Sequence, residues 1–213
     1  MNRFFLLLAL CSFALVLTFS SCSDDDGNAV QEFNANDISK SREEKDYQFK
    51  NSDNSPLAID RRSDFIGLQY FPITEEYFVF ADFTPFETTD TISLPTTKAG
   101  DFRKMIRYGK LNFQIAESKS LELTAFKELD NQQDMLFVPF KDKTSGFTTY
   151  QAGRYLEISE PDEQQMCIID FNRAYNPYCA YNAEYSCPLI PSENILPVFI
   201  KAGEKNPPSK WRI

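Results

Sequence analysis

The segment LNFQIAESKSLELTAF, residues 111–126, decides the fold class of this chain. Apolar and polar side chains alternate over residues 111–115, and they alternate again over residues 121–125. Between the two runs lies ESKS, residues 117–120, which has the polar composition of a turn. Alternation with a period of two places the apolar side chains of a strand on one face. The segment therefore predicts an antiparallel β-hairpin.

Other parts of the chain also contain short apolar runs that are separated by polar turns, without long helices between them. The run YFVFADF, residues 77–83, is apolar on both faces, which is typical of a strand that is covered on both sides. The pattern predicts a mainly β protein, with a single antiparallel sandwich or barrel-like domain of eight or nine strands. The candidate strands besides the hairpin are residues 77–83, 89–94, 102–108, 135–140, 148–159, 164–172 and 195–202.

The sequence that precedes the strands has the composition of a short N-terminal helix. Residues 37–50 are rich in Glu, Lys and Arg, and Asp37 is available as the N-cap. A second short helix is expected from Asp60 to Phe65. We expect the β-rich domain, with this helix, to span residues 37–205, and a flexible Pro-rich tail to follow at residues 206–213.

Residues 1–21 have the pattern of a secretory signal peptide. Arg3 provides a positive charge, residues 4–19 form an apolar run, and two serines precede Cys22. The run is shorter than the ~20 residues that span a bilayer, and its ending resembles that of a bacterial lipoprotein signal. The next residues, SDDDG, resemble the export signal of Bacteroidetes surface lipoproteins. We therefore expect lipidation of Cys22, an acidic tether at residues 22–36 and anchoring in the outer membrane, at the cell surface or alternatively on the periplasmic face.

The residue types that are missing exclude several classes of function. The chain has no histidine, which excludes Ser-His-Asp catalysis, Cys-His catalysis and zinc sites with histidine ligands. Its 7 glycines are spaced too widely to form the GxGxxG or GxxxxGK loops that bind nucleotides. A formal net charge of -9 and the lack of a basic cluster argue against nucleic acid as a partner. We expect no cofactor and no metal.

Two charged residues are expected on apolar faces of strands. Asp170 falls on a largely apolar face of the strand at residues 164–172, and Arg154 does so in the strand at residues 148–159. A charge in such a place needs a partner, so we expect the two side chains to pair. The pair is either architectural or a cradle for a carboxylate or a sugar hydroxyl. Asp170 itself either holds the loop that follows it or acts as a general acid/base or ligand acceptor.

The loop NRAYNPYCAYNAEYSCPLIPSEN, residues 172–194, contains two cysteines, four tyrosines and four asparagines. A disulfide between Cys179 and Cys187 is expected beyond the inner membrane, with free structural thiols as the alternative. Adding Cys167 would make only a poor metal site. The tyrosines and asparagines suit a sugar-binding surface, and they suit equally well the capping of one end of the sheet core. The candidate pocket residues are Arg154, Tyr155, Asp170, Asn172, Tyr175, Asn176, Tyr181 and Glu193.

Several blocks of the sequence together resemble the domain-of-unknown-function family 1684 over residues 43–205. The resemblance implies no established activity. Family members with lipoprotein signals agree with the lipidation expected at Cys22, whereas others lack a secretion signal and keep the cysteine pair. In those members the cysteine pair would not depend on an oxidising compartment, so its presence does not by itself imply a disulfide. The blocks are FIGLQYFP at 65–72, MLFVPFKDKTSGFTTYQAGRYLE at 135–157, IDFNRAYNPYCAYNAEYSCPLIPSEN at 169–194 and AGEK at 202–205.

These observations favour a non-catalytic binding or structural module at the membrane, with a glycan or an envelope protein as its partner. One alternative is a hydrolase, acting on carbohydrate, that uses two carboxylates about 5–10 Å apart. Asp170 would be the first acid and Arg154 would orient the substrate, with Glu157, Asp142 or Glu193 as the second acid. The other alternative is a subunit of an envelope assembly, in which exposed tyrosines of the 172–194 loop would contact the partner.

Overall fold

Seven antiparallel strands form one sheet in the computed structural model, which describes residues 32–116, 118–129 and 135–208. The sheet runs in the order β6-β5-β4-β3-β1-β7, and β2 pairs with β3 beside this path. The lipidation site Cys22 and the signal peptide that the sequence predicts lie outside the described residues. The strands are β1 (Phe78–Pro85), β2 (Thr91–Pro95), β3 (Phe102–Phe113), β4 (Leu121–Glu128), β5 (Met135–Phe140), β6 (Arg154–Ser159) and β7 (Met166–Asp170).

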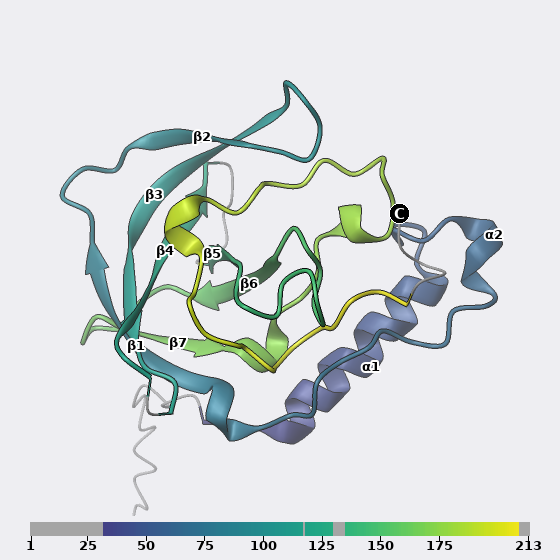
Figure 1. Ribbon diagram of the computed structural model, residues 1–213, viewed down its shortest axis with the longest axis horizontal. Helices are drawn as coiled ribbons and strands as arrows, with labels where there is room; N and C mark the ends of the chain where they lie inside the picture. Colours follow the sequence, from purple (N-terminus) through teal and green to yellow (C-terminus); the bar gives the residue numbers. More distant parts are fainter. Residues whose placement is uncertain (1–31, 117, 130–134, 209–213) are drawn as a thin grey trace, which may run out of the picture. The chain divides into compact units, whose positions relative to one another are not determined.

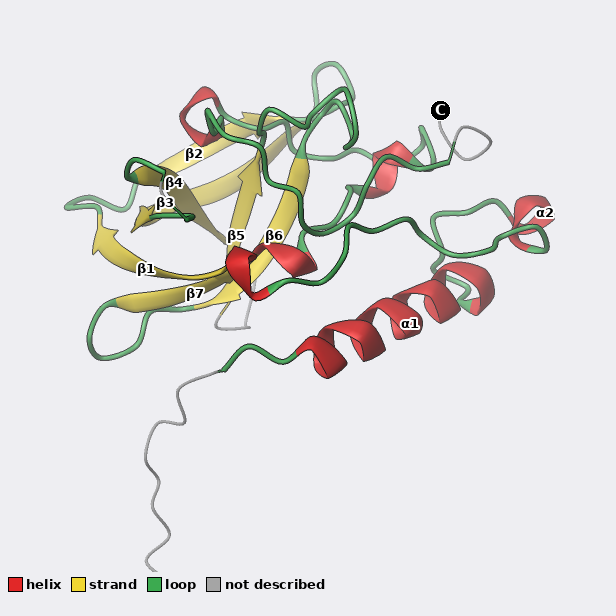
Figure 2. Ribbon diagram, turned by 60° about the horizontal axis from the view of Figure 1, so that its bottom comes forward, coloured by secondary structure: helices red, strands yellow, loops and turns green. Residues whose placement is uncertain are grey.

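The two ends of the sheet meet and give a nearly closed barrel (Figures 1 and 2). Just beyond the end of β7, Tyr175 pairs with Tyr155 of β6 in an isolated antiparallel bridge. Each of the two residues donates its backbone N–H to the carbonyl of the other, at 2.9 and 3.0 Å. The barrel-like alternative of the sequence prediction is therefore confirmed, although with seven strands instead of eight or nine.

The predicted hairpin at residues 111–126 is confirmed by the pairing of β3 with β4, in which Leu111 lies opposite Leu123. The candidate strand at residues 102–108 belongs to the same long strand β3, which contains a bulge between Arg107 and Gly109. A Cβ atom on Gly109 would lie 2.4 Å from the ring of Phe83, so only glycine fits where β1 and β3 approach.

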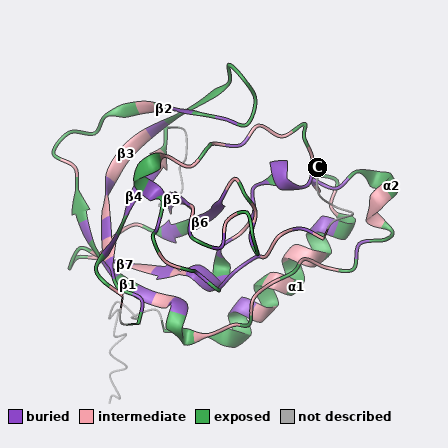
Figure 3. Ribbon diagram, in the orientation of Figure 1, coloured by how far each residue is buried: buried purple, intermediate pink, exposed green. Residues whose placement is uncertain are grey.

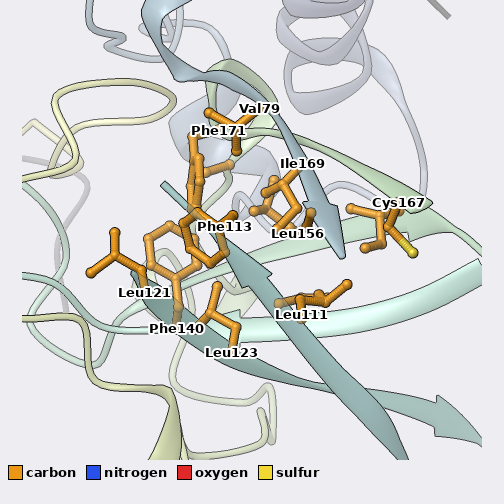
Figure 4. Packing of buried hydrophobic residues seen from close by; sticks show 14 of the residues in the cluster. Val79, Leu111, Phe113, Leu121, Leu123, Phe140, Leu156, Cys167, Ile169 and Phe171 are labelled. Carbon is orange, nitrogen blue, oxygen red and sulfur yellow. The ribbon is translucent and has the colours of Figure 1, made fainter. Parts of the chain in front are cut away.

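The interior of the barrel is filled by apolar side chains of all strands except β2 (Figure 4). The ring of Phe171 is central, with centroids 5.7 Å from Phe113 and 5.3 Å from Phe140. Buried residues concentrate on the strands, whereas the helix α1 is mostly half-buried or exposed (Figure 3). The barrel interior is thus a packed core, and any ligand site has to lie on its outside.

Three strand predictions are wrong at least in part. The candidate strand at residues 148–159 begins only at Arg154, because residues 148–153 lie in turns and an isolated bridge. The run at residues 77–83 was expected to be covered on both faces, but only one face of β1 is buried, and Phe80 is 51% exposed.

The segment 195–202 forms no strand, because the chain bends at residues 197–198 and its pairing with residues 141–143 is limited to an isolated bridge at Ile195. Side chains bond to other parts of its backbone. Its Ile200 N–H donates to the carboxylate of Asp142 at 2.7 Å.

The helices lie outside the barrel. α1 (Ala35–Asn51) starts earlier than predicted, because Asn34 is the N-cap instead of Asp37. The Oδ1 atom of Asn34 accepts the backbone N–H groups of residues 36 and 37, at 3.0 and 3.2 Å. Within the described ranges, no helix is long and apolar enough to cross a membrane. The other helices are α2 (Ile59–Arg62), η1 (Glu75–Tyr77), η2 (Phe171–Arg173), η3 (Tyr178–Ala180) and η4 (Ser192–Asn194).

Candidate functional site

Arg154 lies in the core of the protein, where its side chain is completely buried. Its Nη2 atom donates to the carbonyl of Ile200 at 3.0 Å and to the carboxylate of Asp142 at 3.5 Å. Its Nη1 atom donates to the carbonyls of Ala202 and Glu204. Burial lowers the pKa of Arg154, and the charge of Asp142 opposes that shift. Arg154 therefore clamps the extended C-terminal segment and does not reach a ligand.

Asp170 does not pair with Arg154, so the predicted ion pair between them is wrong. The carboxylate of Asp170 lies 3.3 Å from the Nε atom of Arg173, and it accepts the backbone N–H of Asn172 at 3.0 Å. The side-chain amide of Asn172 in turn holds the backbone of Thr74 through two bonds, of 2.8 and 3.1 Å. Asp170 thus caps η2 and holds the loop, which is the architectural interpretation of its position.

Glu193 lies apart from the other candidate residues. It forms an ion pair with Arg107 on β3, and about a third of each side chain is exposed. Its neighbour Asn194 is buried. The Asn194 side chain accepts the backbone N–H of Thr124 and donates to the Thr124 carbonyl. The segment around η4 is therefore fixed to the outside of the sheet, and Glu193 does not share a pocket with Asp170.

Asn176 and Tyr181 converge on a carboxylate that the sequence analysis did not single out, that of Glu204. Glu204 is 1% exposed, and its Oε2 atom accepts the Asn176 N–H at 2.8 Å and the Tyr181 hydroxyl at 3.1 Å. Its Oε1 atom lies 2.5 Å from the ammonium group of Lys45 on α1. Burial raises the pKa of Tyr181, so that its hydroxyl remains a donor at neutral pH.

Lys45 and Arg42 attach α1 to the barrel through polar contacts. The Lys45 ammonium group lies 4.6 Å from the centroid of the Tyr175 ring, in addition to its ion pair with Glu204. Arg42 donates to the carbonyls of Phe71 and Asn172, at 3.0 and 3.1 Å. Polar side chains of α1 therefore contact the barrel. A groove remains between the C-terminal half of α1 and the loop after β7.

This groove has two adjoining halves of about 570 and about 560 Å³. They meet over a floor that both share, formed by Tyr155, Tyr175, Ser186 and Cys187. The first half is further lined by Ser41, Glu44, Lys45, Gln48, Phe49, Pro177, Tyr178 and Tyr185. The second half is further lined by Phe102, Arg103, Lys104, Met105, Glu128, Leu129, Phe137 and Pro188.

The rings of the floor are fixed by hydrogen bonds of their hydroxyl groups. Tyr155 is nearly buried and donates to the carbonyl of Pro188, while Tyr175 donates to Glu157 at 2.9 Å. The two rings meet edge to face with centroids 5.9 Å apart. Burial raises the pKa values of both phenols, so they are neutral under physiological conditions. The floor is therefore a rigid aromatic surface.

The three cysteines of the described chain are free thiols, and the disulfide between Cys179 and Cys187 stays a prediction. The backbone N–H of Cys179 donates to the Sγ atom of Cys187 at 3.3 Å. Cys167 lies in the barrel core, where burial raises the pKa of its thiol to about 12. The pair borders the groove, since Cys187 belongs to its floor.

The structure therefore divides the predicted pocket. Tyr155 and Tyr175 come together in the groove, and the sequence analysis anticipated these two only as members of a larger set. The contribution of α1, through Lys45 and Phe49, was missed, because nothing in a polar helical stretch indicates which face meets the barrel. Glu204 was also missed as a site residue, although it lies in one of the blocks on which the family resemblance rests.

Comparison with known families agrees with that resemblance. Residues 63–205, more than half of the chain, match the family described as "Protein of unknown function (DUF1684)". The chain belongs to the DUF1684 family. The match starts later than the resemblance suggested, so α1 precedes it, whereas Tyr155, Tyr175 and Glu204 lie within it. The DUF1684 region thus contributes the barrel side of the groove.

The chain is also similar to a solved structure, the solution NMR structure of an uncharacterized protein from Haloarcula marismortui. The identity is 35%, the TM-score is 0.64, and the similarity covers 80% of this chain and 92% of the archaeal one. Comparison with curated proteins finds no match. Neither the family description nor the archaeal relative supplies an activity, so function has to be argued from the groove.

Proposed function

We propose that this protein is an outer-membrane lipoprotein whose DUF1684 domain binds an elongated glycan without catalysing a reaction. The observation that carries the proposal is the two-part groove with its fixed aromatic floor. Each half presents an exposed ring, with Tyr178 40% and Phe102 55% exposed. Aromatic rings in these positions can stack on the apolar faces of successive sugar units.

Polar groups on the groove walls complement these rings. Lys45 and Gln48 on α1 and Ser186 in the loop supply donors and acceptors for sugar hydroxyls. A mostly apolar surface with a few fixed polar groups is the usual composition of a small-molecule site. The length of the groove favours an oligosaccharide over a single sugar, because its two halves adjoin over a common floor.

The positions of the candidate acids support binding without catalysis. Asp142 is buried against Arg154, Asp170 caps η2, and Glu193 pairs with Arg107. None of these three carboxylates lines either half of the groove. The fourth acid that the sequence suggested, Glu157, accepts the Tyr175 hydroxyl at 2.9 Å and likewise lines neither half. The hydrolase alternative would need two carboxylates on opposite sides of a bound sugar bond, and these four acids do not converge there.

Anchoring in the outer membrane is supported by the sequence. Residues 4–19 form an apolar run, and two serines and Cys22 follow it, as in a lipoprotein signal. The acidic stretch after Cys22 favours display on the cell surface. Metabolic labelling with palmitate tests the attachment. Label on the wild type that disappears in Cys22→Ser supports it, and equal labelling of both contradicts it. Protease treatment of intact cells then distinguishes surface from periplasmic exposure.

Isothermal titration calorimetry tests glycan binding, with hexasaccharides of glucose, mannose, xylose and N-acetylglucosamine as ligands. We expect at least one to bind, and Tyr178→Ala to weaken its affinity about tenfold, which corresponds to about 1.4 kcal/mol of lost stacking. The matched control is Tyr47→Ala, which removes a tyrosine of α1 that is 69% exposed and does not line the groove.

Two outcomes contradict the proposal. One is equal affinity of Tyr178→Ala and Tyr47→Ala, which would place the ligand elsewhere. The other is release of new reducing ends from a bound hexasaccharide, lost in Asp170→Asn, which would make the protein an enzyme.

A further inference from the structure

The cysteine pair beside the groove has an asymmetric environment. Cys179 belongs to η3, and Cys187 follows eight residues later, at the end of the loop that forms one wall of the groove. The backbone N–H of Cys179 donates to the Sγ atom of Cys187 at 3.3 Å, whereas the Cys179 thiol has the side chains of Tyr150 and Thr97 as hydrogen-bonding neighbours. Both residues are buried, at 5% and 7% exposure.

We propose that Cys179 and Cys187 form a thiol–disulfide exchange site, in which Cys187 attacks a small disulfide and Cys179 completes the exchange. The site lies at the floor of the groove proposed for glycan binding. The exchange needs no glycan, so neither proposal depends on the other.

The identity of the attacking thiol follows from the donors around it. A thiolate is stabilised by N–H donors, and a backbone N–H cannot change direction as a hydroxyl or thiol can. Donation from the Cys179 thiol, together with the backbone N–H groups of residues 178 and 179, lowers the pKa of Cys187, although its burial opposes that shift. The Cys179 thiol donates its proton in a hydrogen bond to Cys187, and Cys179 is buried. Both effects raise the pKa of Cys179.

Access of a reagent also favours Cys187. Cys187 belongs to the floor where the two halves of the groove meet, and Cys179 does not line either half. The groups that face the pair are mostly neutral, because burial raises the pKa values of Tyr150 and Tyr155. The positive charge of Arg103 acts on Cys187 from the second half of the groove and favours its thiolate.

The exchange has two balanced steps. The Cys187 thiolate attacks one sulfur of oxidised glutathione, which forms a mixed disulfide and releases one glutathione thiolate. Cys179 then loses its proton to solvent and attacks the Sγ atom of Cys187, which forms the protein disulfide and releases the second glutathione thiolate. The pair is oxidised by two electrons, and one molecule of oxidised glutathione is reduced to two thiols.

Mass spectrometry of the full-length chain, treated with oxidised glutathione at pH 7, tests the proposal. Trypsin leaves both cysteines in one peptide, residues 174–201, because no Lys or Arg lies between Arg173 and Lys201. We expect the wild-type peptide to lose two hydrogens. We expect Cys179→Ser to accumulate a glutathione adduct on this peptide, about tenfold faster than Cys187→Ser, because Cys187 lines the groove and accepts a backbone N–H that favours its thiolate.

Cys179→Ala and Cys187→Ala provide a second pair of variants without a hydroxyl group, and circular dichroism verifies that all four are folded. Equal rates of adduct formation in the two single variants would overturn the assignment of roles. Two free thiols in the treated wild type would overturn the site itself. A further readout is alkylation by iodoacetamide, whose rate should rise at a lower pH in Cys179→Ser than in Cys187→Ser.

Discussion

Replacement of Arg154 by methionine decides whether this buried cation is an architectural clamp. Methionine has a similar length and no polar hydrogen atoms, so the Arg154→Met variant fills the space but cannot donate. The carboxylate of Asp142 would lose its only cationic partner within 4 Å in the described chain. The carbonyls of Ile200, Ala202 and Glu204 would lose the guanidinium group to which they are bonded.

The magnitude follows from the burial of the pair. Both side chains are 0% exposed, and removing one partner of a buried ion pair costs about 3–5 kcal/mol, because the other charge remains in the core. Arg107→Met is the matched control. Its partner Glu193 is 34% exposed and can be solvated by water, so a cost of about 1 kcal/mol or less is expected. The double variant Arg154→Met with Asp142→Asn should be more stable than Arg154→Met alone, because the unpaired charge is gone.

Urea denaturation followed by far-UV circular dichroism measures these differences. With a urea m-value of about 2 kcal/mol/M, a loss of about 4 kcal/mol lowers the midpoint by about 2 M. The control should shift the midpoint by about 0.5 M or less. If Arg154→Met and Arg107→Met lower the midpoint equally, the clamp that we infer from the hydrogen bonds does not determine stability.

Three further variants test other contacts. Asn34→Ala removes the N-cap of α1 and should lower the free energy of unfolding by about 1 kcal/mol, measured against Asn36→Ala in urea. Gly109→Ala places a methyl group against Phe83 and should lower the free energy of unfolding in urea by about 1–3 kcal/mol. Burial raises the pKa of Asp46 above its usual value of 3.8. The stability contributed by its neutral form is therefore present below that pH and is lost as pH rises through the pKa of the folded state. Asp46→Asn should therefore gain stability relative to the wild type between pH 3 and pH 7 in thermal melts, and a constant difference would contradict this.

Local patterns made the β-hairpin predictable, but they could not show which faces of a strand are covered. The alternation at residues 111–126 is a property of neighbouring residues, and it survives in the pairing of β3 with β4. The exposure of Phe80 depends on what packs outside β1, which no local pattern records. Residues 195–202 are apolar like a strand, yet both backbone groups of Ile200 bond to side chains, Asp142 and Arg154, from a distant part of the chain.

The candidate site was predictable only where it coincides with the closure of the barrel. Tyr155 and Tyr175 were both expected in the pocket, and they meet because the ends of the sheet pair at these two residues. The ion pair between Lys45 and Glu204 joins residues that are 159 positions apart, in a polar helix and in a segment without regular structure. Any of the many acidic residues would have been an equally good partner for that lysine on sequence grounds.

One chain of contacts connects the core clamp to the proposed binding groove. Arg154 fixes the backbone of the C-terminal segment through the carbonyls of Ala202 and Glu204. The carboxylate of Glu204, held at that point, forms an ion pair with the ammonium group of Lys45 and so sets the position of α1. α1 forms one wall of the groove, and Tyr175, which lies under Lys45, forms its floor. A residue buried in the barrel is thus connected to a surface groove that it does not touch, through two successive contacts of charged groups. If this is correct, Arg154→Lys, which keeps the charge but loses the fork of donors, should weaken hexasaccharide binding while Tyr47→Ala leaves it unchanged.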